Sequence, residues 1–328
     1  DVILSHFLRC FQKLQKTWIK RIMSESQLKV LLLAGGVGGA KMAEGFDAAS
    51  GISLTILGNI GDDDIFHGLW VSPDIDTMIY TLSDQINRNQ GWGVNNDDYK
   101  ALSFLSKLGC ETWMSLGDKD LGLHIYRTER LRSGDRASDI TRDIAKAFGV
   151  KPNIILPSDR RVQTKVLTNH GWLNFQEYFV REQCKPEVKE IDFVGLKEAT
   201  PTIEALEEIS NSDIIVIAPS NPFVSITPIL KVPGISEALK RSKAKKLAVS
   251  PLINGKAVKG PAEKIMISLG LQADVIGIAK FYQEFIDTII IDNIDTPLAP
   301  EIESLGCLLY TSDAADDTPC VDLGGRRI

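Results

Sequence analysis

Four glycines and a lysine lie in one short segment that could bind phosphate. Gly35, Gly36, Gly38 and Gly39 follow an apolar run and precede a helical pattern that contains Lys41. Glycines let backbone N–H groups approach a phosphate closely, and the first turn of a helix carries partial positive charge. The spacing matches neither the P-loop nor a strict GxGxxG fingerprint. We expect phosphate or nucleotide binding here, and a turn needed only for packing is the alternative.

Two groups of aspartates could hold a metal ion or accept a proton. Asp62 lies in the sequence GNIGDDD at 58–64, and Asp74 and Asp76 lie in SPDIDT at 72–77. Carboxylates beside a phosphate-binding turn are typical Mg²⁺ ligands, and a carboxylate can also deprotonate an attacking hydroxyl. The alternatives are a solvated acidic loop for the first group and helix capping for the second.

Three further polar turns could contact a substrate. Ser220 and Asn221 lie between two prolines after an apolar run, where they could meet a base or sugar edge. The sequence LGDKD at 116–120 follows the segment 112–115 and has the character of a strand end followed by glycine and acid. The sequence KGPA at 259–262 offers a further phosphate contact. The histidines show no HxH or HExxH spacing, and nothing indicates a Ser-His-Asp or Cys-His nucleophile.

The elements between these turns alternate between strands and helices. Apolar runs indicate parallel strands at 28–34, 52–57, 154–156, 213–218, 246–250 and 288–291, and helical patterns lie at 75–86, 138–148, 202–209, 235–243 and 262–269. This alternation predicts an α/β fold, a Rossmann-like, doubly wound and mainly parallel sheet with helices on both faces. Ligands of such sheets bind beyond the carboxyl ends of the strands, where the polar turns lie.

Three segments depart from the alternating pattern. Residues 162–167 and 173–180 flank Asn169-His170-Gly171, which predicts a β-hairpin inserted over about 162–193. Residues 1–22 precede Met23, and we expect them to be a non-native upstream extension, with an amphipathic targeting helix as the alternative. Residues 307–328 resemble the translation of a sequencing adaptor. A single domain is therefore expected over 23–306.

The composition is that of an ordinary globular protein. The 328 residues are 44% hydrophobic and carry a formal net charge of −6. This balance excludes dominant disorder and argues against a nucleic-acid partner, and no apolar run is long enough to span a membrane. The five cysteines show no CxxC and no metal-ligand spacing, so we expect reduced thiols in a cytoplasmic protein.

Seven motifs stand in one order that is specific as a set. From about residue 29 to about residue 306 the chain resembles the 2-phospho-L-lactate transferase family of deazaflavin coenzyme biosynthesis. The resemblance implies attack of the ribityl hydroxyl of 7,8-didemethyl-8-hydroxy-5-deazariboflavin on a lactyl- or enolpyruvyl-diphosphoguanosine, with release of GMP, a requirement for Mg²⁺ and a homodimer. It also implies a further strand and a closing helix where the adaptor-like tail stands. The motifs are GGVGGAK at 35–41, NIGDD at 59–63, SPDIDT at 72–77, WG at 92–93, LGDKD at 116–120, PSNP at 219–222 and GPA at 260–262.

The resemblance and the residue chemistry together assign expected roles. Asp62 and Asp74 are the expected Mg²⁺ ligands, and Asp74 or Asp76 orients or deprotonates the attacking hydroxyl. The remaining expected site residues bind substrate. They are Gly36, Gly38, Gly39 and Lys41 on the diphosphate, Ser220 and Asn221 on the guanosine part, Thr77, Gly117, Asp118 and Lys119 on the deazaflavin side, and also Asn59 and Pro222.

Two other functions remain open at this point. One is a non-catalytic regulator that resembles the nucleotide-sugar-binding gluconeogenesis factors, which carry a different glycine- and serine-rich pattern where this chain has residues 66–74. The other is an NAD(P)-dependent dehydrogenase. It has only the glycine turn in its favour, because Leu57-Gly58-Asn59 stands where an acidic residue would grip the ribose.

Overall fold

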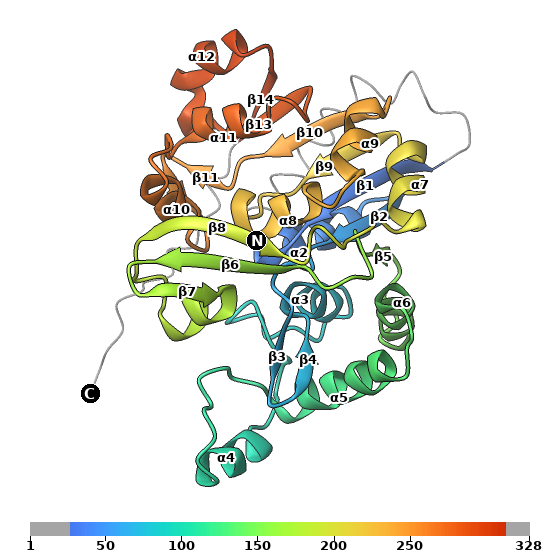
Figure 1. The fold of residues 1–328 in the computed structure, drawn as a ribbon. Helices are drawn as coiled ribbons and strands as arrows, with labels where there is room; N and C mark the ends of the chain where they lie inside the picture. The colour runs from blue at the N-terminus through green and yellow to red at the C-terminus, as the bar shows by residue number, and fades with distance from the viewer. Residues whose placement is uncertain (1–26, 313–328) are drawn as a thin grey trace.

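A seven-stranded, all-parallel sheet forms the centre of the computed structural model, which describes residues 27–312 (Figure 1). The expectations for residues 1–22 and for the end of the tail lie outside the described residues. Numbered along the chain, the strands stand in the order 3-2-1-4-5-6-7, so the predicted doubly wound sheet is confirmed. Listed from the edge formed by the last strand to the opposite edge, they are β14 (Leu308–Ser312), β13 (Thr288–Asp292), β10 (Lys245–Val249), β9 (Ile214–Ile217), β1 (Leu28–Ala34), β2 (Ile52–Gly58) and β5 (Asn153–Ile155).

Strand β1 shows why apolar runs located the sheet. Six of its seven residues are buried and Lys29 alone is exposed, because helices cover the sheet and leave no solvent face. It pairs with β2 along its whole length and with β9 on the other side. The chain runs to β2 after leaving β1 and returns to β9 on the opposite edge of β1. The loops after β1 and β9 therefore diverge, which opens a crevice at this switch point.

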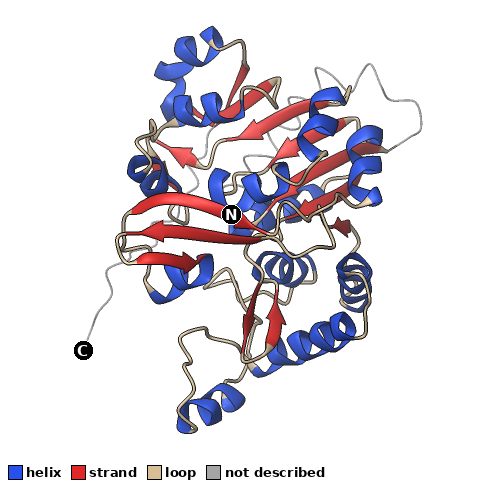
Figure 2. Ribbon diagram, viewed as in Figure 1, coloured by secondary structure: helices blue, strands red, loops and turns tan. Residues whose placement is uncertain are grey.

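Helices flank the sheet and build a second group beside it (Figure 2). The helices α3 to α6 lie together with the hairpin β3–β4 (Asp64–Phe66 and Leu69–Val71), below the central sheet in Figure 1. The helical elements, with α3 to α6 among them, and the short strands β11 and β12 lie between the sheet strands along the chain. They are α2 (Gly36–Ala48), α3 (Pro73–Leu82), α4 (Lys100–Lys107), α5 (Asp118–Arg132), α6 (Ala137–Ala147), α7 (Ile203–Asn211), η3 (Pro222–Ile226), α8 (Thr227–Leu230), α9 (Ile235–Arg241), β11 (Leu252–Ile253), β12 (Lys256–Ala257), α10 (Ala262–Ser268), α11 (Val275–Tyr282), η4 (Asn293–Leu298) and α12 (Ala299–Ser304).

The inserted hairpin is present, but its second strand is shorter than predicted. Strands β6 (Gln163–Thr168) and β7 (Gly171–Asn174) pair antiparallel, and β8 (Val188–Val194) adds a third strand that the sequence pattern did not predict. The expectation that the strand continues to 180 is wrong, because η2 (Glu177–Arg181) follows as a π-helical turn. Its Glu177 carboxylate accepts a hydrogen bond from the backbone N–H of Asn174, which ends the strand there.

Three other boundaries differ from the sequence-based expectations. Helix α3 ends at Leu82 and not at 86, since Asp84 adopts a left-handed φ of 57° and the N–H groups of the next two residues bond to the Tyr80 carbonyl. Residues 112–115 do not form the expected strand end; they lead as a loop into α5. The expected tail begins at 307, whereas Leu308–Ser312 continue the sheet as β14, parallel to β13.

Candidate active site

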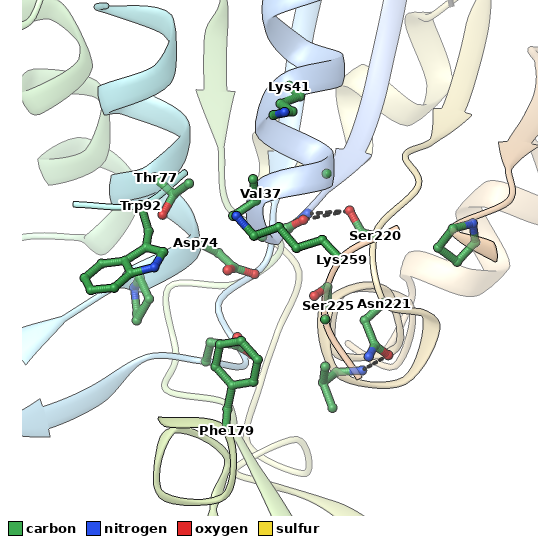
Figure 3. A pocket seen from close by; sticks show the side chains of 18 of the residues that line it. Val37, Lys41, Asp74, Thr77, Trp92, Phe179, Ser220, Asn221, Ser225 and Lys259 are labelled. Carbon is green, nitrogen blue, oxygen red and sulfur yellow. Dashed lines mark hydrogen bonds between the residues drawn. The ribbon is translucent and has the colours of Figure 1, made fainter. Parts of the chain in front are cut away.

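A cavity of about 610 Å³ opens at the switch point of the sheet (Figure 3). The loops that follow β1, β9 and β10 form one side of it, and α3, α5 and η2 form the other. Ligands of open α/β sheets bind at this position, beyond the carboxyl ends of the strands. Nine of the predicted site residues line the cavity: Gly36, Gly38, Lys41, Asp62, Asp74, Asp76, Thr77, Ser220 and Asn221.

The glycine turn after β1 is packed against its surroundings on both sides. Gly36, the first residue of α2, has a left-handed φ of 62°. A Cβ on Gly35 would lie 2.4 Å from Oδ2 of Asp74, and a Cβ on Gly38 would lie 2.5 Å from the Pro219 carbonyl oxygen. Only glycine fits at these two positions, because any side chain would collide with these neighbouring atoms. The start of α2 lines the cavity, where its N–H groups can meet a ligand.

Ser220 fixes the glycine turn from the loop after β9. Its hydroxyl donates to the Gly35 carbonyl at 2.7 Å and accepts from the Gly35 N–H at 3.2 Å. The neighbouring Asn221 uses its side-chain oxygen to cap η3, where it accepts from the N–H groups of Phe223 and Val224. Its amide nitrogen is buried without a hydrogen-bond partner among the described residues, so this donor remains available to a ligand.

Two buried carboxylates share one amide group at the foot of the turn. The Nδ2 atom of Asn59 lies 3.1 Å from Oδ1 of Asp62 and 2.9 Å from Oδ2 of Asp74. Burial, followed by the charge of Asp74, raises the pKa of Asp62 well above its usual range. Burial also raises the pKa of Asp74 to about 6, although hydrogen bonds from Asn59 and from the Gly36 backbone oppose the rise. The pair is thus destabilised when both groups are ionised and no cation is present.

The donor set of this pair fits Mg²⁺. Mg²⁺ prefers oxygen ligands and is usually held by one or two carboxylates together with substrate phosphates. Asp62 and Asp74 offer that number of carboxylates beside the glycine turn. Among residues 27–312 there is no group of three or more His, Cys, Asp or Glu side chains that could hold a metal ion.

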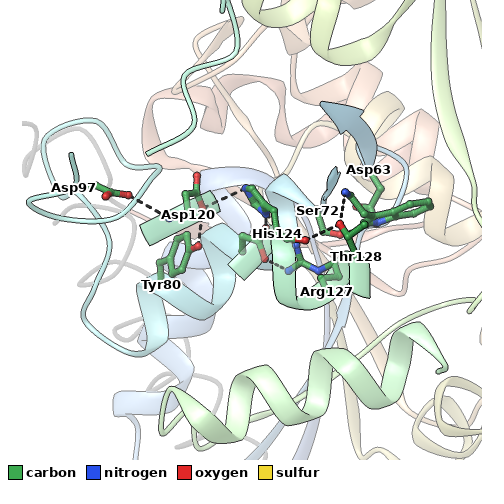
Figure 4. A network of polar contacts seen from close by, with 10 residues as sticks. Asp63, Ser72, Tyr80, Asp97, Asp120, His124, Arg127 and Thr128 are labelled. Carbon is green, nitrogen blue, oxygen red and sulfur yellow. Dashed lines mark hydrogen bonds and ion pairs between the residues drawn. The ribbon is translucent and has the colours of Figure 1, made fainter. Parts of the chain in front are cut away.

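A buried ion pair holds Asp76 in the cavity wall, and its partner Arg127 lies beside His124 in the polar network of Figure 4. Both carboxylate oxygens of Asp76 accept from the guanidinium of Arg127 on α5, with Nη1 at 3.1 Å from Oδ2. His124 lies between this pair and Asp120, with Nε2 at 3.5 Å from Oδ1 of Asp120. The hydroxyl of Tyr80 donates to the same Asp120 oxygen at 2.6 Å. The network joins α3 to α5 and fixes the position of the Asp76 side chain.

Three predicted site residues lie behind the wall of the cavity and not on it. Gly39 lies under the turn, where a Cβ would come within 2.9 Å of the Ala34 side chain. Asn59 is fully buried and orients the two carboxylates, and Pro222 is buried in the first turn of η3. These residues act through the packing of the turn and the loop.

The segment 117–119, which was expected to line the deazaflavin side, supports the neighbouring segment 95–101 instead. The carboxylate of Asp118 accepts from the backbone N–H groups of Lys100 and Ala101, and the Lys119 ammonium donates to the carbonyls of Asn95 and Asn96. Gly117 packs against Asp97. The structure thus places Gly117, Asp118 and Lys119 next to the cavity, and the residues around them form its wall: Ser115, Leu116, Asp120 and His124.

Several residues in the cavity wall or directly behind it were not predicted as site residues. Arg127 holds Asp76 from 51 positions away, and no local spacing connects the two. Phe179 and Trp92 bring aromatic rings to the cavity from η2 and from the loop before α4. Two signals were present in the sequence: the WG and KGPA motifs contain Trp92 and Lys259, which both line the cavity.

Comparisons with known proteins find relatives over most of the chain. A family model described as 2-phospho-L-lactate transferase CofD matches residues 30–304. A 2-phospho-L-lactate transferase of Methanosarcina acetivorans is 38% identical over 285 residues, which cover 87% of this chain and 92% of that protein. A phosphoenolpyruvate transferase of Streptomyces griseus is 35% identical over 286 residues, with 85% and 90% covered.

A solved structure supports the fold. Protein BH3568 of Bacillus halodurans superposes with a TM-score of 0.57 at 19% sequence identity, covering 88% of this chain and 93% of that one. None of the helices between residues 27 and 312 is both long and apolar enough to cross a membrane. Over nearly the whole described length, this chain belongs to the 2-phospho-L-lactate transferase CofD family of enzymes.

Proposed function

We propose that this protein transfers a phospholactyl or phosphoenolpyruvyl group from a guanosine diphosphate ester to the ribityl hydroxyl of 7,8-didemethyl-8-hydroxy-5-deazariboflavin, with release of GMP. The relatives support both donors, since proteins named for each group are 38% and 35% identical to this chain. The observation that carries the proposal is the pair of carboxylates, Asp62 and Asp74, at the foot of an open glycine turn.

In this proposal the glycine turn and Lys41 bind the diphosphate of the donor. The N–H groups at the start of α2 and the lysine ammonium place positive charge where phosphoryl transfer develops negative charge. Asp62 and Asp74 would hold Mg²⁺, which supplies further neutralisation of the phosphate oxygens when bound. Asn221 offers its unpartnered amide nitrogen to the guanosine part, and Ser220 keeps the turn in place.

The acceptor hydroxyl attacks the phosphorus that carries the three-carbon group. A new P–O bond forms, the bridging P–O bond breaks, and its electron pair leaves with the phosphate oxygen of GMP. Asp74 is the expected acceptor of the hydroxyl proton, because its carboxylate lies at the foot of the glycine turn; bound Mg²⁺ would lower its pKa below the value of about 6 that burial gives the metal-free site. Asp76, which Arg127 holds through both oxygens, orients the hydroxyl and shapes the local charge.

Incubation with substrates tests the proposal directly. The deazaflavin, each guanosine diphosphate ester and Mg²⁺ are mixed with the protein, and product and GMP are identified by mass analysis. We expect one phosphodiester product and equimolar GMP, and no product when EDTA replaces Mg²⁺. Release of GMP without a phosphodiester would contradict the transfer.

The Asp74→Asn variant tests both proposed roles of Asp74, as proton acceptor and as Mg²⁺ ligand, in the same assay. We expect kcat to fall by about 10²–10⁴, the usual contribution of a positioned general base, while the melting temperature stays close to that of the wild type. An exposed substitution on α2, Asp47→Asn, is the control for the loss of one negative charge. Normal turnover of Asp74→Asn would remove this carboxylate from the mechanism.

We also propose a cytoplasmic homodimer. The three cysteines of the described segment, Cys110, Cys184 and Cys307, are free thiols, which suits a reducing compartment. Light scattering on the purified protein measures the mass in solution and distinguishes a dimer from the 36.1 kDa monomer.

A further inference from the structure

Lys259 reaches over the glycine turn from the opposite side of the cavity. It follows β12 and precedes Gly260, whose left-handed φ of 84° turns the chain toward α10. Figure 3 shows its side chain extended across the start of α2 beside Val37. Lys259 and Lys41 both line the cavity, and they do so from separate elements.

The ammonium of Lys259 also holds a loop that follows α3. It donates to the Gln90 carbonyl at 2.7 Å. The next residue, Gly91, has a φ of 78°, and a Cβ there would lie 2.7 Å from the Lys259 nitrogen and 3.1 Å from Val37. The segment 90–93 therefore packs directly on the glycine turn. Trp92 follows and contributes its ring to the cavity wall. The residue is 43% exposed.

Lys41 and Lys259 place two positive charges beside the glycine turn. Partial desolvation, followed by the charge of Lys41, lowers the pKa of Lys259. Two ammonium groups that repel each other at one cavity wall are stabilised by an anion that binds to both. A diphosphate carries enough charge and enough acceptor oxygens for this, and a lysine ammonium has three N–H donors, of which Gln90 uses one.

We propose that Lys259 binds the diphosphate of the donor while it holds the segment 90–93 over the glycine turn. Donor binding thereby fixes Trp92 at the cavity wall before the acceptor enters. This inference rests on the proposed function for the identity of the donor. It adds a substrate-binding residue to the site and predicts that donor and acceptor subsites are linked through one side chain.

Binding of GDP and of guanosine to the Lys259→Met variant tests the inference. In the presence of Mg²⁺, we expect the Kd for GDP to rise by about 10- to 100-fold, the effect of losing a charge-assisted hydrogen bond, with little change for guanosine. Lys259→Arg should retain part of the affinity for GDP. Lys256→Met, at an exposed position of β12 three residues before Lys259, is the matched control and should bind GDP as the wild type does.

Tryptophan fluorescence tests the second half of the inference. GDP should protect Trp92 from acrylamide quenching in the wild type, and this protection should vanish in Lys259→Met and in Trp92→Phe. Equal GDP affinity of Lys259→Met and wild type, or an equal loss for GDP and guanosine, would overturn the role of Lys259 while leaving the proposed function intact. Failure of the wild type to bind GDP would instead overturn the proposed function itself.

Discussion

Asp63 illustrates how a single side chain near the site costs stability. Burial raises its pKa to about 7, although Ser72, the charge of Arg127 and Trp70 oppose the rise. One of its oxygens accepts from the Ser72 hydroxyl and the Trp70 indole, and the other is buried without a partner among the described residues. An ionised carboxylate in such a place is poorly solvated, so burial disfavours the charged form more than the neutral form.

Asp63→Asn is therefore expected to gain stability over the wild type as the pH rises. Because the pKa of Asp63 is higher in the folded than in the unfolded state, its protonation stabilises the folded wild type fully below pH 4. This contribution is lost as the pH rises toward 7. Between pH 5 and pH 8 the difference in the free energy of unfolding should grow by about 1–3 kcal/mol in favour of the variant. Urea unfolding in EDTA measures it, with Asp47→Asn as control. A pH-independent difference would show that Asp63 is not the titrating group.

Residue types alone identified part of the site. Asp62, Asp74, Ser220 and Asn221 were found because parallel strands end at one edge of a sheet, so polar residues after different strands meet there. Arg127 could not be found in this way. It lies in the middle of a charged helix, and its role depends on the packing of α5 against α3, which no sequence spacing encodes.

At the level of elements, α2 and the loop after β9 are in direct backbone contact. The Cβ of an alanine at 38 would lie 2.5 Å from the Pro219 carbonyl oxygen, and this backbone atom cannot rotate away. We expect Gly38→Ala to lower the free energy of unfolding by about 1–3 kcal/mol and to weaken GDP binding, because the start of α2 must move. Calorimetry and urea unfolding measure the two effects.

Gly122→Ala is the matched control for this prediction. Gly122 lies at an exposed position inside α5 and has nothing within 4 Å of the added Cβ. Alanine is the better helix former, so this variant should be more stable than the wild type by up to about 1 kcal/mol. If both variants were stabilised, the contact with Pro219 would not constrain the turn.

Strands and helices with a consistent pattern of apolar residues were predicted well, and those in which apolar and polar residues are mixed were not. The central strands are buried on both faces, so their apolar runs gave bounds that agree within one residue. The segment 173–180 is apolar and aromatic enough to predict a strand, yet Glu177 ends β7 and the chain turns into η2. Helix α5 was missed because it buries polar residues, His124 and Arg127 among them, and has no clear apolar stripe.

At the scale of the whole molecule, the strand order joins distant parts of the chain at one cavity. The loops after β1, β9 and β10 come from the central sheet, while α3, α5 and η2 come from the segments between β2 and β9. A ligand in the cavity therefore contacts both parts and is lost when either unfolds. Binding to the folded state alone stabilises the whole protein in proportion to the logarithm of ligand concentration.

Thermal unfolding with different nucleotides should consequently separate the candidate functions. At about 100 times its Kd, GDP with Mg²⁺ should stabilise the protein by about 2.7 kcal/mol, which raises Tm by on the order of 5 °C. The stabilisation should shrink in EDTA and in Asp62→Asn, because both remove cation binding beside the diphosphate. NADH and UDP-sugars should give no comparable rise, since the end of β2 lacks an acid to grip a ribose and carries Gly58 and Asn59 instead. A larger rise with NADH would favour a dehydrogenase, and one with a UDP-sugar would favour a nucleotide-sugar-binding regulator on the same fold.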